Sequence, residues 1–291
     1  MPVSAQPRFV VVLGAARSGT TLLRDLISAH PAVAAVPFDV NHVWRIGNEQ
    51  QPDDVLVPES ATPEVAERIR SRLTAFARRN AGAADWSNVR FIAEKTVGNA
   101  LRPAFVEKVL PGTLYVRIVR DPRRTIASTI AAWKAPPDAG YLVRKARYFG
   151  LADLGYAAWY AANAVRGRLS HGRGLKVWGA RYAGIREDLE ALGLETVCAR
   201  QWLASVRSID AFFQDLPADR GVSVSYEDLT ADPAALARIW SFLGIADEAR
   251  AAEVFRDTVV SNASGCPELP GSINGETLRA VEDLVARYGY A

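Results

Sequence analysis

Residues 9–21 read FVVVLGAARSGTT, and this stretch decides the fold that the sequence predicts. Residues 9–13 are an unbroken apolar run, which is typical of a parallel strand buried on both faces. Apolar residues then recur at helical spacing over residues 20–29. The predicted order is strand, glycine-rich turn and helix, which is the context that a phosphate-binding loop requires.

The turn departs from the nucleoside triphosphate loop at its most informative position. That loop reads G-x-x-x-x-G-K-[ST], and its lysine reaches the outer phosphates. Gly14 and Gly19 have the required separation and Thr21 stands at the Ser/Thr position, but Thr20 replaces the lysine. Backbone N–H groups and the dipole at a helix N-terminus bind an anion without lysine, and Arg17 adds a guanidinium that suits phosphate or sulfate oxygens.

A second strand and helix carry another pair of candidate anion ligands. Leu114–Val119 is predicted to be a strand, and a helix is predicted to begin with Asp121 as N-cap and Pro122 in its first turn. Arg120 stands at the end of the strand, and Ser128 lies about two helical turns further on, so both can flank one anion. Two anchors on parallel strands suit a nucleoside with phosphate groups at both ends.

Strand and helix patterns alternate along the rest of the chain. Helix starts are predicted at Thr62-Pro63 and Asp232-Pro233. Residues 220–226 alternate like a strand, residues 144–168 are expected to be mostly helical, and residues 276–287 are expected to form the last helix. Surface loops are expected over residues 48–61 and 261–274. The fold class predicted for residues 1–291 is a single α/β domain with a mainly parallel sheet flanked by helices.

Composition limits the classes of function. The chain has 291 residues with a net charge of +3, which is too weakly basic to predict nucleic-acid binding. Cys198 and Cys266 lack metal-type spacing, and no metal site is predicted; two incidental thiols in a reducing compartment are the expectation. The first residues lack a secretory pattern, and the longest near-apolar run, residues 155–165, is too short to cross a bilayer. We expect a soluble, cytoplasmic protein without a transmembrane segment.

The stretches GAARSGTTLL and YVRIVRDPRRTIAST resemble the two nucleotide-binding motifs of the sulfotransferases that use 3′-phosphoadenosine-5′-phosphosulfate (PAPS). The form RSGTTLLR followed by His-Pro is most similar to tyrosylprotein and bacterial sulfotransferases. The resemblance implies the P-loop-like sulfotransferase fold, with Arg120 and Ser128 at the 3′-phosphate and Tyr226, in VSYEDL, lining the adenine. It also implies that the 5′-phosphosulfate is held by Arg17, Ser18, Gly19, Thr20 and Thr21.

The sequence departs from these relatives in two places. The basic-glycine cluster that many cytosolic relatives use for the 3′-phosphate is not visible, and residues 261–272 are expected to form the corresponding loop. The acidic pair that follows His-Pro in tyrosylprotein relatives is also missing, and the sequence there reads AVAAVPFD, ending at Asp39.

Sulfuryl transfer to an alcohol needs a base, cations that absorb charge, and reactants held in line. By resemblance, Arg17 holds the phosphosulfate and Lys95, in Glu94-Lys95-Thr96, stabilises the bridging oxygen; the alternative for Lys95 is a surface ion pair with Glu94. Two candidates remain for the base. Asp39 is favoured by analogy with the acidic residue of the tyrosylprotein relatives, and His42 by a reference pKa of about 6.5.

The predicted function is therefore transfer of a sulfuryl group from PAPS to a hydroxyl of a small-molecule, carbohydrate or lipid-linked acceptor, without a metal. Two alternatives are a P-loop kinase of a small molecule and a non-catalytic nucleotide-binding module. The missing lysine argues against the kinase. The sequence does not identify the acceptor or the oligomeric state, and four tryptophans could line an acceptor pocket or fill the core: Trp44, Trp133, Trp178 and Trp202.

Overall fold

The computed structural model describes residues 6–82, 86–136, 140, 148, 177–259 and 267–290. The predicted helical stretch over residues 144–168 lies outside these ranges except for Tyr148, and so do residues 261–266 of the predicted loop and Cys266.

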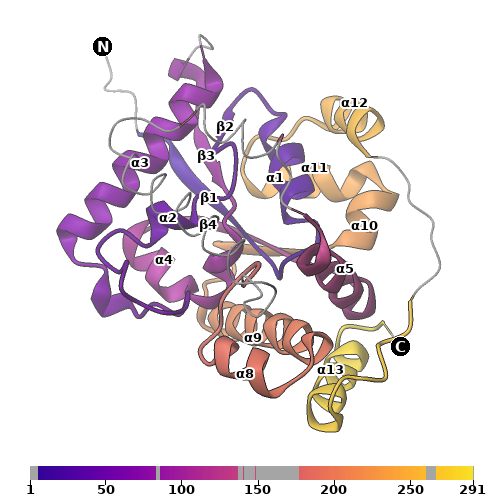
Figure 1. The fold of residues 1–291 in the computed structure, drawn as a ribbon. Helices are drawn as coiled ribbons and strands as arrows, with labels where there is room; N and C mark the ends of the chain where they lie inside the picture. Colours follow the sequence, from indigo (N-terminus) through magenta and orange to yellow (C-terminus); the bar gives the residue numbers. More distant parts are fainter. Residues whose placement is uncertain are drawn as a thin grey trace.

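Five strands, all parallel to their neighbours, form one sheet in the order β2-β3-β1-β4-β5 (Figure 1). The central strand β1 (Arg8–Leu13) pairs with β3 (Phe91–Glu94) on one side and β4 (Leu114–Val119) on the other. The edges are β2 (Val33–Ala35) and β5 (Gly221–Ser225). The prediction of an α/β fold with a parallel sheet is confirmed.

Helices cover both faces of the sheet, as Figure 1 shows. One face carries α2 (Asn41–Trp44), α3 (Pro63–Ala81) and α4 (Pro103–Val109). The opposite face carries α1 (Thr20–Ser28), α10 (Tyr226–Ala231), α11 (Pro233–Phe242) and α12 (Glu248–Thr258). A third group comprises α5 (Pro122–Lys134), α8 (Ile185–Ala191), α9 (Leu194–Asp215) and α13 (Gly275–Arg287). Short 3₁₀ helices are η1 (Pro58–Ser60), η2 (Trp86–Asn88) and η3 (Val97–Leu101).

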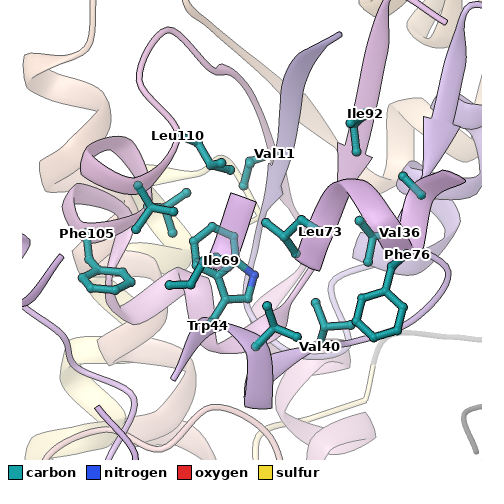
Figure 2. Close-up of a cluster of buried hydrophobic side chains, with 14 of the residues drawn as sticks. Val11, Val36, Val40, Trp44, Ile69, Leu73, Phe76, Ile92, Phe105 and Leu110 are labelled. Atoms are coloured by element: carbon teal, nitrogen blue, oxygen red, sulfur yellow. The ribbon is translucent and has the colours of Figure 1, made fainter. Parts of the chain in front are cut away.

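The core follows from the apolar run that forms β1. Because successive side chains of a strand point to opposite faces, Val10 and Val12 pack toward α1 and α11, while Val11 and Leu13 pack toward α3 and α4. Figure 2 shows the second of these clusters, with Trp44 at its centre. Both faces of β1 are therefore buried, as its unbroken run of apolar residues predicts.

Three of the four tryptophans considered for an acceptor pocket belong to the packed interior of the described residues. Trp44, Trp133 and Trp202 are all buried, and Trp178 packs half-buried against the cluster around α9. The sequence left open whether these side chains line an acceptor pocket or fill the core. Trp44, Trp133 and Trp202 fill the core.

The predicted helix starts are confirmed by their caps. Three side chains accept a backbone N–H in the first turn of a helix: Thr62 from Val65, Asp121 from Arg123, and Asp232 from Ala234. The strand predicted over residues 220–226 ends at Ser225, because the Ser225 hydroxyl accepts the N–H of Asp228 and starts α10 at Tyr226. Within the described ranges, none of the helices has the length and apolarity to span a bilayer.

Candidate active site

The candidate site lies at the carboxyl edge of the three central strands. Because β3, β1 and β4 are parallel neighbours, the segments that follow them leave the sheet at the same edge. These segments carry Lys95 after β3, Arg17 after β1 and Arg120 after β4. Topology therefore brings three cations from three sequence motifs to one edge.

Residues 14–21, which we call the glycine loop, present backbone donors at the start of α1. Gly19 is the N-cap with φ 95°, and no side chain caps the helix. Within the described residues, no acceptor receives a hydrogen bond from the amide N–H of Gly19, Thr20 or Thr21. Ser18 is turned inward, and its hydroxyl donates to the Ala15 carbonyl at 2.7 Å. The loop thus keeps a fan of N–H groups available for an anion.

Arg17 adopts φ 68°, and among the described residues it has the one positive φ outside glycine. A left-handed conformation is unfavourable for a residue with a Cβ atom by about 1–2 kcal/mol, so the surrounding contacts must hold it. The Arg17 Nε donates to Ser128 Oγ at 2.9 Å, and the Arg17 carbonyl accepts from Arg120 Nη1 at 3.0 Å. The sequence placed Arg17 in one anchor and Ser128 in the other; the structure joins the two anchors directly.

Arg120 also stacks on an aromatic ring. Its guanidinium carbon lies 4.1 Å from the centre of the Tyr226 ring, and its Nε is buried without a hydrogen-bond partner in the described part of the chain. The same ring packs against the glycine loop, since a Cβ atom at Gly19 would lie 2.4 Å from Tyr226 Cδ2. Tyr226, expected beside the adenine, therefore lies between the start of α1 and Arg120.

Among the residues that the structure describes, the three cations have no carboxylate partner. Across the described ranges, no ion pair involves Arg17, Lys95 or Arg120. Lys95 is only 7% exposed, which argues against the surface role considered for it. Burial lowers the pKa of Lys95, and the negative charge of Asp39 opposes that shift.

Glu94 does not pair with Lys95 in the way the sequence left open. Its two carboxylate oxygens accept from Trp44 Nε1 and Asn99 Nδ2, each at 3.0 Å. Burial raises the pKa of the Glu94 carboxyl, against the hydrogen bonds that it accepts. Glu94 thus anchors the segment behind Lys95 and leaves the ammonium group for another partner.

The two candidate bases occupy different positions. Asp39 accepts the N–H of Asn41 on Oδ1 at 3.2 Å and the N–H of Val97 on Oδ2 at 2.9 Å. These bonds orient the carboxylate beside the segment that follows β3. His42 lies on α2, with its ring edge-on to Phe76 at a centroid distance of 6.3 Å. Among the described residues, no group of three or more His, Cys, Asp or Glu side chains is arranged to hold a metal ion.

Thr96 contributes a contact that the sequence analysis missed. Its hydroxyl accepts the N–H of Val40 at 3.1 Å, so Thr96 and Val97 together hold the residues around Asp39. The sequence signal for this contact is the hydroxyl of Thr96 next to Lys95, whereas the prediction for Glu94-Lys95-Thr96 used only the two charged residues.

A buried charge network lies behind Asp39. Asp54, expected in a surface loop, is fully buried; its carboxylate pairs with Arg45, Arg102 and Arg181 and accepts from Asn41 Nδ2 at 3.0 Å. The expectation of a surface loop was therefore wrong at this residue. Although burial raises the pKa of the Asp54 carboxyl, hydrogen bonds from Arg181 and the charge of Arg102 outweigh it and lower the pKa to about 2.

The comparisons with known proteins identify the family of the chain. The family model described as "Sulfotransferase family" matches residues 7–177, more than half of the chain. The chain therefore belongs to the sulfotransferase family, whose members transfer sulfuryl groups. No curated protein sequence matches it.

Several solved sulfotransferase structures are similar over nearly the whole chain. The sulfotransferase domain from the curacin biosynthetic pathway is 17% identical, with 96% of this chain and 97% of that chain covered and a TM-score of 0.48. The sulfotransferase from Alicyclobacillus acidocaldarius is 15% identical, with coverages of 98% and 92% and a TM-score of 0.48. Mouse sulfotransferase SULT7A1, solved in complex with PAP, is 14% identical, with coverages of 97% and 85% and a TM-score of 0.46.

Proposed function

We propose that this sulfotransferase uses PAPS as donor and transfers its sulfuryl group to a hydroxyl of a small-molecule, carbohydrate or lipid-linked acceptor. One observation carries the proposal: the glycine loop and the Arg17–Ser128–Arg120 cluster form two linked anion anchors whose guanidinium groups have no carboxylate partner in the described residues. A charge left unpaired at a sheet edge stabilises little by itself, and it suits a dianionic ligand.

The residues fit a nucleotide that carries phosphates on both sides of its ribose. The amides of Gly19, Thr20 and Thr21, with Arg17, would hold the 5′ end, and Arg120 with Ser128 would hold the 3′-phosphate. A phosphate oxygen would satisfy the buried Arg120 Nε, which has no other partner among the described residues. The contact of Tyr226 with adenine stays a prediction; its ring already lies beside the glycine loop.

When bound, PAPS supplies an activated sulfuryl group. The acceptor oxygen would form a bond to sulfur as the bond from sulfur to the bridging oxygen breaks, and the hydroxyl proton would pass to a base of this chain. We assign the base to Asp39, because its carboxylate is oriented by two backbone N–H groups and its negative charge favours the protonated form of Lys95. Lys95 would neutralise the charge that develops on the bridging oxygen.

Two donors supplied in parallel test the function. The purified protein is given sulfur-labelled PAPS or γ-phosphorus-labelled ATP with magnesium, together with pooled phenolic, carbohydrate and lipid acceptors. We expect labelled product from PAPS, also in the presence of EDTA, and none from ATP. Phosphorylated product without sulfated product would establish the kinase alternative, and tight nucleotide binding without any turnover would favour the non-catalytic module.

We also propose that residues 1–291 form a single sulfotransferase domain. The family match ends at residue 177, but β5 lies beyond it and completes the same sheet by pairing with β4. Separate expression of residues 1–177 should therefore give an insoluble or unfolded product, because the sheet would lose one edge strand and the core would lose α9 and α11.

A further inference from the structure

Two consecutive residues at the start of α10 contact the segment that carries Arg120. The Tyr226 ring lies under the Arg120 guanidinium at 4.1 Å. The next residue, Glu227, accepts the backbone N–H of Asp121 on Oε1 at 3.3 Å. The first two residues of α10 thus contact both the side chain of Arg120 and the backbone that follows it.

Tyr290, near the C-terminus, contacts both Glu227 and the helix that follows Arg120. Tyr290 donates its hydroxyl to Glu227 Oε2 at 2.8 Å, and its carbonyl accepts from Arg123 Nη2 at 2.6 Å. Both oxygens of Glu227 are therefore occupied, one by the backbone after Arg120 and one by Tyr290. This fixes the carboxylate in one orientation.

The Tyr226 ring also connects the two anion anchors. It fills the space that a Cβ atom at Gly19 would need, so it lies against the N-cap of α1 on one side and the Arg120 guanidinium on the other. A long arginine side chain loses conformational freedom when it is held, and a surface that holds it beforehand removes that cost from ligand binding.

We propose that Tyr226 and Glu227 are positioning residues that hold Arg120 in the orientation in which it binds the 3′-phosphate, and that Tyr290 holds Glu227 in turn. The proposal rests on the proposed function, because it presumes a 3′-phosphorylated nucleotide. It differs from a role for Tyr226 as an adenine contact. Loss of an adenine contact weakens all adenine nucleotides equally, whereas loss of a positioning residue weakens only those with a 3′-phosphate.

The test is a ratio of two dissociation constants, that for adenosine 5′-phosphate divided by that for adenosine 3′,5′-bisphosphate, measured by calorimetry in EDTA. In Tyr226→Leu we expect the ratio to fall at least about threefold, the lower part of the range for a lost cation–π contact. Tyr226→Phe keeps the ring and should keep the ratio. The ratio measured in Arg120→Ala is the lowest value expected, because that variant lacks the guanidinium altogether.

A matched pair of hydroxyl deletions tests the C-terminal contact. Tyr290→Phe removes the donor to Glu227 and should lower the ratio. Tyr288→Phe removes a hydroxyl two residues away that donates to Asp210, outside the Arg120 arrangement, and should leave the ratio unchanged.

An unchanged ratio in Tyr226→Leu, whether both affinities fall equally or neither falls, would overturn the positioning role. So would equal effects of Tyr290→Phe and Tyr288→Phe on the ratio. A wild-type protein that does not prefer the bisphosphate at all would instead contradict the proposed function, so the two failures are distinguishable.

Discussion

The Arg120 guanidinium links the Arg17 carbonyl to the Tyr226 ring and leaves its own Nε unpartnered in the described residues. We predict that Arg120→Ala weakens binding of adenosine 3′,5′-bisphosphate by about 10- to 150-fold, because a charge-assisted contact contributes about 1.5–3 kcal/mol. Binding of adenosine 5′-phosphate should change much less. Calorimetry with both nucleotides checks this, and equal losses would mean that Arg120 does not bind the 3′-phosphate.

Lys95 is buried at the site without an ion pair in the described ranges, so its charge is available to a developing anion. In Lys95→Met, which keeps most of the volume, we expect kcat to fall on the order of 100- to 1000-fold, the usual cost of one lost transition-state contact. Nucleotide affinity should change little, because that contact strengthens as the reaction proceeds.

The matched control for Lys95 is Lys134→Met, which alters a side chain that is 62% exposed and pairs with Glu195. That variant should turn over like wild type. A Lys95→Met variant that keeps its kcat would remove Lys95 from the mechanism.

The pH dependence of the rate distinguishes Asp39 from His42 as the catalytic base. If Asp39 is the base, Asp39→Asn loses most of kcat together with the acidic limb of the pH–rate profile, while His42→Ala stays active. Turnover measured from pH 4 to 9, with nucleotide affinity as a check of folding, tests this. The opposite pattern, with a limb at about pH 6–7 that disappears in His42→Ala, would assign the base to His42.

At the scale of elements, the Asp54 network ties the segment before η1 to α2 and to Arg181. The pKa of Asp54 falls from 3.8 to about 2 on folding, so its contribution to stability is fully present above pH 4 and is lost as the pH falls toward 2. This lowering of the pKa corresponds to about 2 kcal/mol of folding free energy.

We therefore predict that Asp54→Asn lowers the free energy of unfolding by at least about 2 kcal/mol at pH 7, and that the difference from wild type shrinks by about 1 kcal/mol at pH 3. Urea unfolding at both pH values measures it. Asp53→Asn, at the neighbouring position, is the control and should cost little. A difference between Asp54→Asn and wild type that does not change with pH would contradict the proposed ionisation of Asp54.

Elements with a local signal, such as a capping residue or a long apolar run, were predictable, and elements without one were not. Asp121-Pro122 and Thr62-Pro63 mark helix starts because capping oxygens and proline act locally. α9, with 22 residues, begins after Gly193 without a side-chain cap and was not predicted. β2 has three residues and β3 has four, which is too short for a hydrophobic period to emerge.

At the scale of the whole molecule, the sequence predicted the two anion anchors but not the contacts between them. Each anchor is a local motif of strand, turn and helix start, so its residues could be identified from spacing. The contacts from Arg17 to Ser128 and from Tyr226 to Gly19 join segments far apart in the chain and depend on the strand order. Asp54 could not be found because a polar loop gives no sign that one of its carboxylates is buried among arginines.

The central claim is that this edge of the sheet binds a nucleotide with a 3′-phosphate. The most direct measurement is calorimetric titration of the wild-type protein with adenosine 3′,5′-bisphosphate, adenosine 5′-phosphate and ATP, each in EDTA. We predict one-to-one binding of the bisphosphate at least about tenfold tighter than of either other nucleotide, because neither of them can engage Arg120 and Ser128 through a 3′-phosphate. Equal binding of all three nucleotides, or tightest binding of ATP, would contradict the account.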